Sequence, residues 1–320
     1  MSTILITGGC GFVGSHLARF LLQHDYNVIL MDSAVNEKLV RDIRARSVIV
    51  EADVTDKAQL TQVLRKHRVD GLVHYAAILS SAAESQPFLG YKVNFEGVWN
   101  VYNAARASEV ESVIFASSTA AYGSEASQKP KENIYTVPQT LYGISKQFGE
   151  MLGFWFYRKY GIQFAAFRYG SIVGPGRRNG GASAYSTLII QKPSQGQPYR
   201  VNVRKEDSIP VAYIKDAAEV TTLAYENIKR LKSRVYNVVS LSSSPTAGEL
   251  ASSVKKHIPK AAITFDPDPK TVAMVRSWPR NLDIRRVQTE LRWRPRYSNL
   301  DTLITDFAAE VKEHPEMFHI

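Results

Sequence analysis

The sequence predicts an α/β fold in which a doubly wound parallel sheet is followed by a smaller C-terminal region. Short β-branched runs alternate with amphipathic stretches through the first half of the 320 residues. A glycine-rich turn joins the first run to the first amphipathic stretch, and after about residue 174 turn-forming residues become frequent. Strands that alternate with helices in this way indicate a parallel sheet covered on both faces. Right-handed crossovers then give a Rossmann-type sheet.

The first half contains most of the expected elements. Runs rich in Val, Ile and Leu predict strands at residues 4–6, 27–31, 48–50, 71–74, 112–116 and 162–169. Apolar residues at helical spacing predict helices at residues 16–22, 57–67, 93–107 and 142–160. We therefore assign residues 1–174 to a Rossmann domain.

Residues 175–320 are expected to form a smaller region, interleaved with the end of the sheet. A strand is predicted at residues 235–239, and helices at residues 247–257 and 300–312. Pro193, Gly196 and Pro198 interrupt the chain before them. A region of this size beside the sheet is suited to cover a substrate.

Composition limits the classes of function. Apolar residues make up 44% of the chain and charged residues 22%, as in ordinary globular enzymes. Cys10 is the single cysteine, so a reducing, cytoplasmic location is expected. The beginning of the chain lacks the pattern of a signal peptide, and no apolar run approaches the ~20 residues that span a bilayer. The net charge of +10 is scattered without a nucleic-acid motif, so neither a nucleic acid nor a membrane is an expected partner.

A dinucleotide-binding turn is the strongest local signal. Gly8, Gly11 and Gly14 directly follow the first strand and open a helix. A side chain at Gly8 or Gly11 would obstruct the tight turn and the approach of a pyrophosphate, and Gly14 lets the helix pack closely on the strand. The start of the helix, with Phe12 and Val13, presents backbone N–H groups to phosphate. This strand–turn–helix context predicts a dinucleotide cofactor.

Asp32, at the end of the second strand, indicates which dinucleotide is bound. A carboxylate there can accept hydrogen bonds from the adenosine ribose hydroxyls, and it would repel a 2′-phosphate. Neither Met31 nor Ser33 supplies the arginine that NADP usually requires. The expected cofactor is therefore NAD.

Two later segments are expected at the same cofactor. Asp53 and Val54 follow the third strand and are placed to meet the adenine ring, although Asp53 is also suited to cap the next helix. Ala76 and Ala77 follow the fourth strand, where small side chains let the backbone approach the cofactor. A buried strand end explains Ala77 equally well.

Tyr142 and Lys146 form the candidate catalytic pair. They are four residues apart, so on a helix they share one face. A lysine ammonium near a phenol favours the phenolate and lowers the tyrosine pKa from about 10. Tyr142 would then be usable as a general base near neutral pH, and Lys146 could also hold the nicotinamide ribose.

Ser118 completes the expected catalytic group. It follows the fifth strand, and hydroxyls at the carboxyl end of a strand face the crevice where open α/β sheets bind ligands. From there Ser118 could orient a substrate oxygen toward Tyr142. Ser117 and Thr119 compete for this role, and capping of the turn is the structural alternative for each hydroxyl.

Taken together, these motifs resemble the extended short-chain dehydrogenases/reductases, the NAD-dependent epimerase/dehydratase family. Residues 91–94 and 168–175 also match segments of that family. The resemblance covers essentially the whole chain, and its N-terminal motifs are highly specific. It implies that Asn94 lies near the active site and that Asn94, Tyr169 and Ile172 contact the cofactor.

The same resemblance bears on the substrate. Nucleotide-sugar members usually carry Arg-Tyr-Phe-Asn at residues 168–171, where this chain has Arg-Tyr-Gly-Ser, and the missing asparagine helps to hold a diphosphate. Residues 204–217 likewise depart from their Gly-Asp-Gly…Arg-Asp-Phe stretch. Residues 77–80, 209–213 and 277–283 are similar instead to the short-chain type of L-threonine 3-dehydrogenase.

Residues 179–186 and 189–196 look more like the aldonate-oxidising, erythronate-type relatives. A small polar hydroxy compound, with or without a carboxylate, is therefore the expected substrate. The candidate substrate residues are Ser80, Ser118, Thr119, Ser183 and Tyr185. Arg177, Arg178 and Lys192 are candidate partners for an anion, although solvated surface charge is the simpler interpretation of each.

The expected function is NAD-dependent hydride transfer to or from this hydroxy compound, with no metal ion. The alternative is a sugar or nucleotide-sugar epimerase/dehydratase that uses the same residues. A third class, an NAD-sensing or scaffold protein, fits poorly with an intact Ser118, Tyr142 and Lys146. A homodimer is expected to form through a four-helix bundle of residues 93–107 and 142–160, in which the helical aromatic and apolar side chains are interface or core. These are Phe148, Leu152, Trp155 and Phe156.

Overall fold

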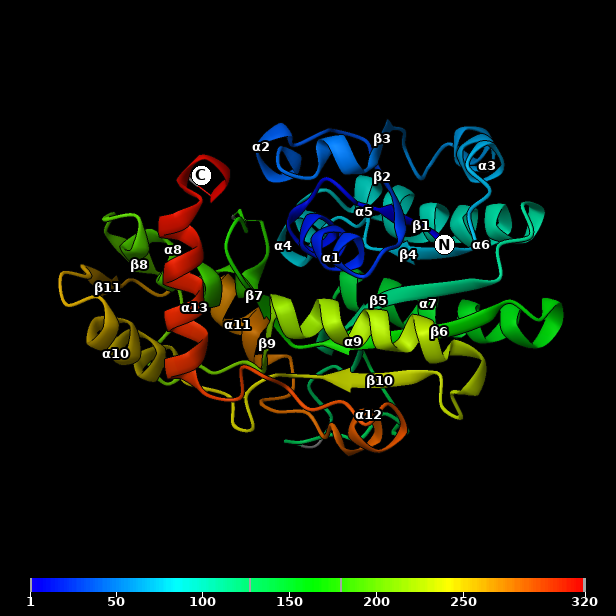
Figure 1. The fold of residues 1–320 in the computed structure, drawn as a ribbon. Coiled ribbons are helices and arrows are strands. Elements are labelled where there is room, and N and C mark those ends of the chain that lie inside the picture. The colour runs from blue at the N-terminus through cyan, green and yellow to red at the C-terminus, as the bar shows by residue number, and fades with distance from the viewer. Residues whose placement is uncertain (1, 127, 179, 319–320) are drawn as a thin grey trace.

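A seven-stranded parallel sheet forms the centre of the computed structural model, which describes residues 2–126, 128–178 and 180–318 (Figure 1). The strand order is β10-β6-β5-β4-β1-β2-β3. The strands are β1 (Thr3–Thr7), β2 (Asn27–Asp32), β3 (Val48–Glu51), β4 (Gly71–His74), β5 (Ser112–Ser118), β6 (Gln163–Tyr169) and β10 (Val235–Val238). The chain adds strands outward from β1 in one direction and then from β4 in the other, which confirms the doubly wound Rossmann-type sheet. The reversal between β1 and β4 is the place where such sheets bind ligands.

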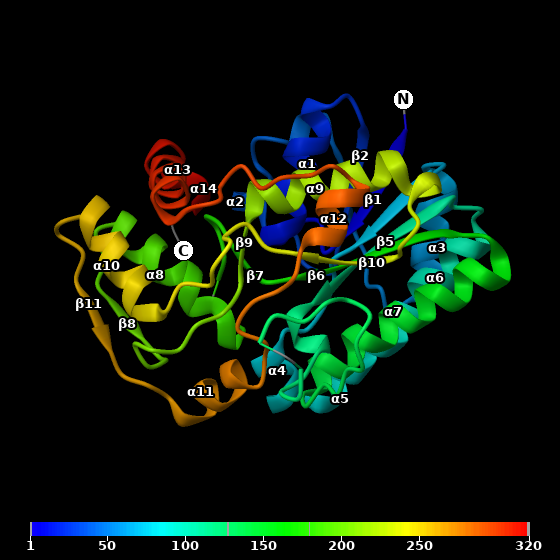
Figure 2. The same cartoon turned by 90° about the horizontal axis from the view of Figure 1, so that it is seen from below.

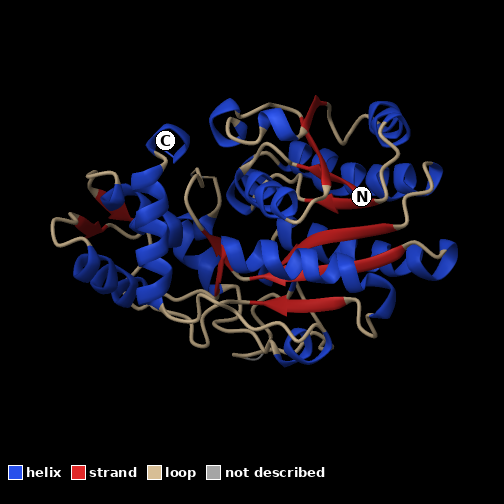
Figure 3. Cartoon of the chain, viewed as in Figure 1, coloured by secondary structure: helices blue, strands red, loops and turns tan. Residues whose placement is uncertain are grey.

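Helices cover both faces of this sheet, as Figure 3 shows in blue and red. The helices are α1 (Phe12–Gln23) and α9 (Ile214–Asn227) on one face, and α3 (Lys57–Lys66), α6 (Gly97–Ala107) and α7 (Leu141–Tyr160) on the other. Alternate side chains of β1 enter different cores: Ile4 and Ile6 pack beneath α1 and α9, and Leu5 packs beneath α3 and α6. All three side chains are fully buried. Two apolar layers explain why this strand reads as a continuous apolar run.

Two glycines set the distance between α7 and the sheet. A Cβ at Gly149 would lie 2.2 Å from the ring of Phe115 on β5, and one at Gly153 would lie 2.3 Å from the ring of Phe164 on β6. The helix begins after Thr140, whose hydroxyl accepts a hydrogen bond from the Gly143 N–H at 3.0 Å. The close approach brings the first turns of α7 to the carboxyl end of β5.

The C-terminal region has an apolar core of its own beside the sheet (Figure 2). Its elements are β7 (Ser171–Val173), α8 (Tyr185–Ser194), β8 (Tyr199–Val201), β9 (Val211–Tyr213), α10 (Ala247–His257), β11 (Ile263–Phe265), α11 (Pro269–Arg276), α13 (Leu300–Glu313) and α14 (Pro315–Phe318). Shorter helices elsewhere are α2 (Glu37–Val40), α4 (Ser80–Ser85), α5 (Pro87–Tyr91) and α12 (Arg285–Glu290). Because α9 and β10 return to the central sheet, the two parts of the chain are interleaved. The division at residue 174 stays a prediction.

The structure departs from the sequence-based elements in a few places. The strand expected at residues 112–116 continues to Ser118, and residues Lys92–Glu96 form a π-helical turn before α6. Helix α8 was not predicted because Pro193 suggested an interruption, but Pro193 lies in its last turn. Asn179, within the segment similar to aldonate-oxidising proteins, lies outside the described residues. None of the helices in the described part of the chain meets the length and hydropathy that crossing a bilayer requires.

The packing of α7 predicts an unusual sign for one substitution. Replacing a helical glycine by alanine ordinarily stabilises a protein by about 0.5–1 kcal/mol. Gly149→Ala should instead destabilise this one by about 1–3 kcal/mol, because the new methyl group would overlap the Phe115 ring. Urea unfolding of both proteins measures the difference, with the exposed Arg158→Ala on the same helix as control. A more stable Gly149→Ala protein would show that α7 does not lie this close to β5.

Candidate active site

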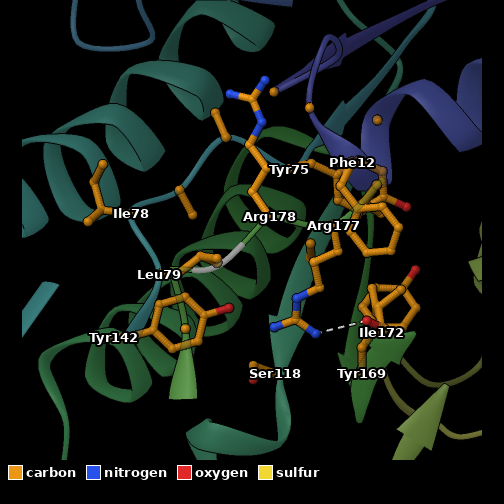
Figure 4. A pocket seen from close by; sticks show the side chains of 18 of the residues that line it. Phe12, Tyr75, Ile78, Leu79, Ser118, Tyr142, Tyr169, Ile172, Arg177 and Arg178 are labelled. Carbon is orange, nitrogen blue, oxygen red and sulfur yellow. Dashed lines mark hydrogen bonds between the residues drawn. The ribbon is translucent and has the colours of Figure 1, made fainter. Parts of the chain in front are cut away.

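A cavity of about 530 Å³ opens at the carboxyl ends of the central strands. Its wall combines the turn after β1, the ends of β2, β4 and β5 and the start of α7. The segment after β6 adds Tyr169, Gly170, Ser171, Ile172, Gly176, Arg177, Arg178, Gly181 and Ser183. This volume lies within the usual range for small-molecule sites. The cavity therefore occupies the place where a doubly wound sheet binds its ligand (Figure 4).

The glycine turn after β1 is shaped for close approach. Gly8 has a φ of +66°, and a Cβ there would lie 2.7 Å from the backbone nitrogen of Ala76. A Cβ at Gly14 would lie 2.3 Å from the carbonyl oxygen of Gly8, so only glycine lets α1 begin so near the turn. Phe12 and Val13, the first residues of α1, line the cavity. The residues present thus fit a pyrophosphate at the helix N-terminus.

Asp32 ends β2 on the rim of the same cavity. Its carboxylate accepts hydrogen bonds from the backbone N–H of Cys10 at 3.1 Å and of Ala34 at 3.4 Å. Burial raises the pKa of Asp32, and these backbone hydrogen bonds oppose the shift. The backbone thus holds the carboxylate on the rim of the cavity, where ribose hydroxyls of a dinucleotide could donate to it.

The other expected cofactor residues gather around this turn, with one exception. Asp53, Val54, Ala76 and Ala77 line the cavity, as do Tyr169 and Ile172. Asp53 does not cap α3: its carboxylate accepts from the Thr55 N–H at 2.8 Å, and Asp56 is the capping residue.

The exception is Asn94, which is buried and does not line the cavity. Its side-chain amide accepts from the Ile78 N–H at 2.8 Å and donates to the Ile78 carbonyl at 2.9 Å. Ile78 is itself part of the cavity wall. Asn94 therefore holds the loop after β4 in place, and the structure gives it no position against the cofactor.

Tyr142, Lys146 and Ser118 meet at the inner end of the cavity. Tyr142 and Lys146 lie one turn apart on α7, with the Lys146 Nζ 5.1 Å from the centre of the Tyr142 ring and 5.0 Å from that of Phe115. Ser118 ends β5, and its hydroxyl accepts from the Ala120 N–H at 3.2 Å. The carboxyl end of β5 and the first turns of α7 thus bring the three side chains to one place.

The two neighbouring hydroxyls differ in what they contact. Ser117 also borders the cavity, but its hydroxyl donates to the carboxylate of Glu150, which is paired with Arg168 at 2.6 Å. The Thr119 hydroxyl is buried at the cavity and has no hydrogen-bond partner within the described part of the chain. Ser117 is thus engaged in the core, whereas Ser118 lies at the cavity in hydrogen-bond contact with Tyr142.

The ionisable groups of this end are strongly shifted. Burial raises the pKa of Tyr142 to about 12, against a hydrogen bond from Ser118 and the positive charge of Arg177, both of which lower it. Burial also lowers the pKa of Lys146 to about 7, which the carboxylate of Glu150 partly offsets. The expectation that the pKa of Tyr142 falls below about 10 is therefore wrong for this structure, because burial of the phenol outweighs the groups that lower its pKa.

The candidate substrate residues separate into two groups. Ser80, Ser118, Thr119 and Ser183 line the cavity, whereas Tyr185 is buried in the C-terminal core and does not. Sequence reasoning did not assign Trp278, whose buried indole N–H borders the cavity without a hydrogen-bond partner among the residues described. Its only signal was the resemblance of residues 277–283 to threonine dehydrogenases.

The three basic candidates also separate. Arg178 is exposed, although it also borders the cavity, and Lys192 is partly exposed and donates to the Gln197 side chain at 3.0 Å. Arg177 is only 9% exposed and lies on the cavity wall. Solvated surface charge is therefore the wrong interpretation for Arg177, because its side chain turns inward from the loop after β7.

Asp32 generates a prediction about the cofactor. NAD should bind at least about tenfold more tightly than NADP, about 1.4 kcal/mol, because a 2′-phosphate would meet this carboxylate. Asp32→Ala should reduce the preference for NAD, which calorimetric titration with each dinucleotide measures. Glu313→Ala removes an exposed carboxylate that does not line the cavity and serves as the control. Equal affinities in the unaltered protein would contradict the role of Asp32.

Comparison with known proteins agrees with this arrangement. The model of the NAD dependent epimerase/dehydratase family matches residues 4–239. The mitochondrial L-threonine 3-dehydrogenase of Sus scrofa is 32% identical over 308 residues, which cover 94% of this chain and 80% of that protein. The corresponding protein of Bos taurus is 30% identical over the same shares of the two chains.

Solved structures show the same likeness. The holo form of an L-threonine dehydrogenase from Cupriavidus necator superimposes with a TM-score of 0.89 at 26% identity, covering 97% of this chain and 99% of that one. A UDP-glucose 4-epimerase of Thermus thermophilus in complex with NAD gives 0.84 at 25% identity, with the same coverage. The chain therefore belongs to the NAD-dependent epimerase/dehydratase family of extended short-chain dehydrogenases/reductases, and it is an NAD-dependent enzyme of the dehydrogenase or epimerase type.

Proposed function

We propose that this protein is a dehydrogenase that oxidises a small polar hydroxy compound, a hydroxy acid or a threonine-like molecule, with NAD as cofactor. The observation that carries the proposal is that Ser118, Tyr142 and Lys146 line the same cavity as Asp32 and the glycine turn after β1. The relatives named L-threonine 3-dehydrogenases support an oxidation of this kind.

Each side chain has a distinct role in this proposal. Ser118 donates a hydrogen bond that orients the substrate hydroxyl, and Tyr142 removes the proton of that hydroxyl. Lys146 holds the nicotinamide ribose and, when protonated, favours the Tyr142 phenolate. Bound NAD supplies the acceptor for the hydride that leaves the carbinol carbon. The proton and the hydride together account for the two hydrogens lost when the alcohol becomes a carbonyl compound.

A positive charge near Tyr142 is essential to this scheme. Burial alone favours the neutral phenol, and the pKa of about 12 would leave very little phenolate at neutral pH. Arg177 lowers that pKa already in the free protein, and Lys146, whose own pKa burial lowers to about 7, supplies a second positive charge when it is protonated. The proposed base thus depends on two cations from different parts of the chain.

Epimerisation is a second candidate, favoured by the likeness to UDP-glucose 4-epimerase structures. In that reaction the same residues oxidise the substrate transiently, and the ketone is then reduced on its other face. An epimerase would hold NAD without exchange and accumulate no NADH. Following NADH absorbance with hydroxy acids, amino alcohols and nucleotide sugars separates the two reactions.

The proposed base generates a prediction. Tyr142→Phe keeps the ring and its packing but removes the group that takes the proton, so turnover should fall by about 10²–10⁴. NAD affinity should stay within a few-fold, because the hydroxyl acts on the substrate oxygen. Steady-state rates and NAD titration measure the two effects, with Tyr135→Phe, at a side chain 87% exposed, as the matched control.

Two further variants separate the other roles. Ser118→Ala should lower turnover and spare NAD binding, whereas Lys146→Ala should lower both. Near-normal turnover by Tyr142→Phe on the true substrate would show that the mechanism is wrong in its central residue.

We also propose a homodimer formed through α6 and α7. Leu152 and Phe156 are core residues in the structure, but Trp155 is 38% exposed and Trp99 of α6 is 45% exposed. The centres of these two indole rings lie 6.3 Å apart. Exposed apolar side chains of this size on adjacent helices are typical of interfaces. The dimer accounts for them, since burial in an interface removes their apolar surface from water.

The expected solution mass is therefore twice 35.8 kDa. Trp155→Glu should shift the protein toward the monomer, because a carboxylate would be buried at the interface. Light scattering at micromolar concentration measures both masses, and Tyr135→Glu introduces the same charge at an exposed site as control. A monomeric unaltered protein would refute the dimer.

A further inference from the structure

Arg177 is a buried cation whose hydrogen-bond partners within the described residues are all neutral. Its Nη1 donates to the Ser171 hydroxyl at 3.0 Å and to the Ile172 carbonyl at 2.9 Å, and its Nη2 donates to the Ser183 hydroxyl at 2.8 Å. Within residues 2–126, 128–178 and 180–318, no Asp or Glu carboxylate forms an ion pair with it. These contacts use three of the five guanidinium N–H groups. A charge in this position is expected to have an anionic partner.

The chain's other buried arginines show what such partners look like. Arg168 donates to both carboxylate oxygens of Glu150, at 2.8 and 2.6 Å. Arg234 lies 4.1 Å from the centre of the Tyr157 ring and donates to the carbonyls of Phe164 and Ile228, so it stacks and joins backbone segments away from the cavity. Arg177 alone among these three lines the cavity.

Its surroundings hold the guanidinium in a fixed direction. Figure 4 shows Arg177 between Ile172 and Tyr142, whereas Arg178 extends away from Tyr142. Ser171 on β7 and Ser183 in the turn before α8 hold it from either side of the loop that contains it. Burial lowers the pKa of Arg177 to about 10, and the Tyr142 phenol, when ionised, would raise it. At neutral pH the group therefore remains charged beside the proposed base.

We propose that Arg177 binds a carboxylate of the substrate, so that the protein acts on small hydroxy acids with the reacting hydroxyl on the first or second carbon from the carboxylate. This inference rests on the proposed function and narrows it. A planar guanidinium matches a carboxylate in shape and charge. Because Arg177 and Tyr142 line the same cavity and lie near each other in it (Figure 4), a molecule that contacts both side chains is expected to be short.

The contact with Arg177 also bears on the difference between this chain and nucleotide-sugar enzymes at Ser171. Ser171 stands where nucleotide-sugar members of the family carry the asparagine that helps to hold a diphosphate, and here its hydroxyl accepts from Arg177. A diphosphate is also an anion, so the test must separate a carboxylate ligand from a nucleotide. The bound carboxylate would also compete with the phenolate for the positive charge, so Tyr142 would depend more on Lys146 once substrate is present.

Binding can be measured without turnover by using acids that cannot be oxidised. 2-Hydroxyisobutyrate and 3-hydroxy-3-methylbutyrate are tertiary alcohols, so their carbinol carbon has no hydrogen to transfer. Calorimetric titration of each acid into the NAD complex, beside its uncharged primary amide and UDP-glucose, should show that an acid binds about tenfold or more tightly than its amide.

Two substitutions test the residue. Arg177→Leu should weaken binding of the acid about 10–100-fold and leave binding of the amide nearly unchanged, so the preference for the acid disappears. Arg177→Lys keeps a charge but loses the planar guanidinium, so its affinity for the acid should lie between those of the unaltered protein and Arg177→Leu. Arg230→Gln removes an exposed arginine away from the cavity and should change nothing. NAD affinity within about threefold of the unaltered protein verifies that each variant is folded.

The outcomes separate the inference from the proposed function. Equal binding of acid and amide, or an acid preference that survives Arg177→Leu, would overturn the role of Arg177. Tight binding of UDP-glucose with none of either acid would overturn it as well. If the acids bind through Arg177 but no secondary hydroxy acid yields NADH, the carboxylate site stands and the proposed dehydrogenase function fails.

Discussion

The close contact between α7 and β5 is the constraint on which the candidate site depends. Tyr142 and Lys146 belong to the helix, and Ser118 belongs to the strand. The chain connects the strand to the helix only through the intervening residues 119–141, so packing must set their relative position. Gly149 places the helix backbone directly over the ring of Phe115, so the distance between the two elements is fixed by an aromatic ring rather than by long, adjustable side chains. Catalytic side chains that are carried by packed helices and strands are held more accurately than side chains on loops.

A buried polar network extends the same contact into electrostatics. Glu150, one turn after Lys146, accepts from Arg168 on β6 and from Ser117 on β5. Its carboxylate therefore joins helix and sheet, and it also raises the pKa of Lys146 against the effect of burial. Removing one member of a buried pair of this kind leaves an uncompensated charge and typically costs about 3–5 kcal/mol. Fold stability and the charge of the proposed site are thus linked through one side chain.

The sequence was sufficient for features that are local in the chain. The glycine turn, Asp32, and the Tyr142–Lys146 pair depend on spacing within one strand–turn–helix unit or one helix, and the structure places all of them on one cavity. The seven-stranded sheet followed from the alternation of short strands and helices. Helix α8 was not predicted, because Pro193 suggests the end of any regular element. In the structure this proline is accommodated in the last turn of the helix.

Features that depend on distant residues could not be predicted in this way. Whether Asn94 meets a cofactor or the Ile78 backbone is decided by the path of the loop after β4, which no spacing encodes. Tyr185 lies two residues from Ser183, yet only Ser183 reaches the cavity, because the turn before α8 directs them differently. The burial of Arg177 is likewise a property of the fold, since the neighbouring Arg178 has the same side chain and remains exposed.

Arg168 and Arg177 illustrate how one chain treats a buried cation in two ways. Arg168 has its carboxylate in the same chain, so folding itself completes the pair and the site is permanently neutralised. In the part of the chain that the structure describes, Arg177 has hydroxyl and carbonyl partners, which orient the guanidinium but do not balance its charge. An anion that enters the cavity would balance that charge, and burial of the guanidinium would strengthen the attraction. In the proposed arrangement, the side chain that would select the substrate lies on a different segment from the helix and strand that would carry out proton transfer.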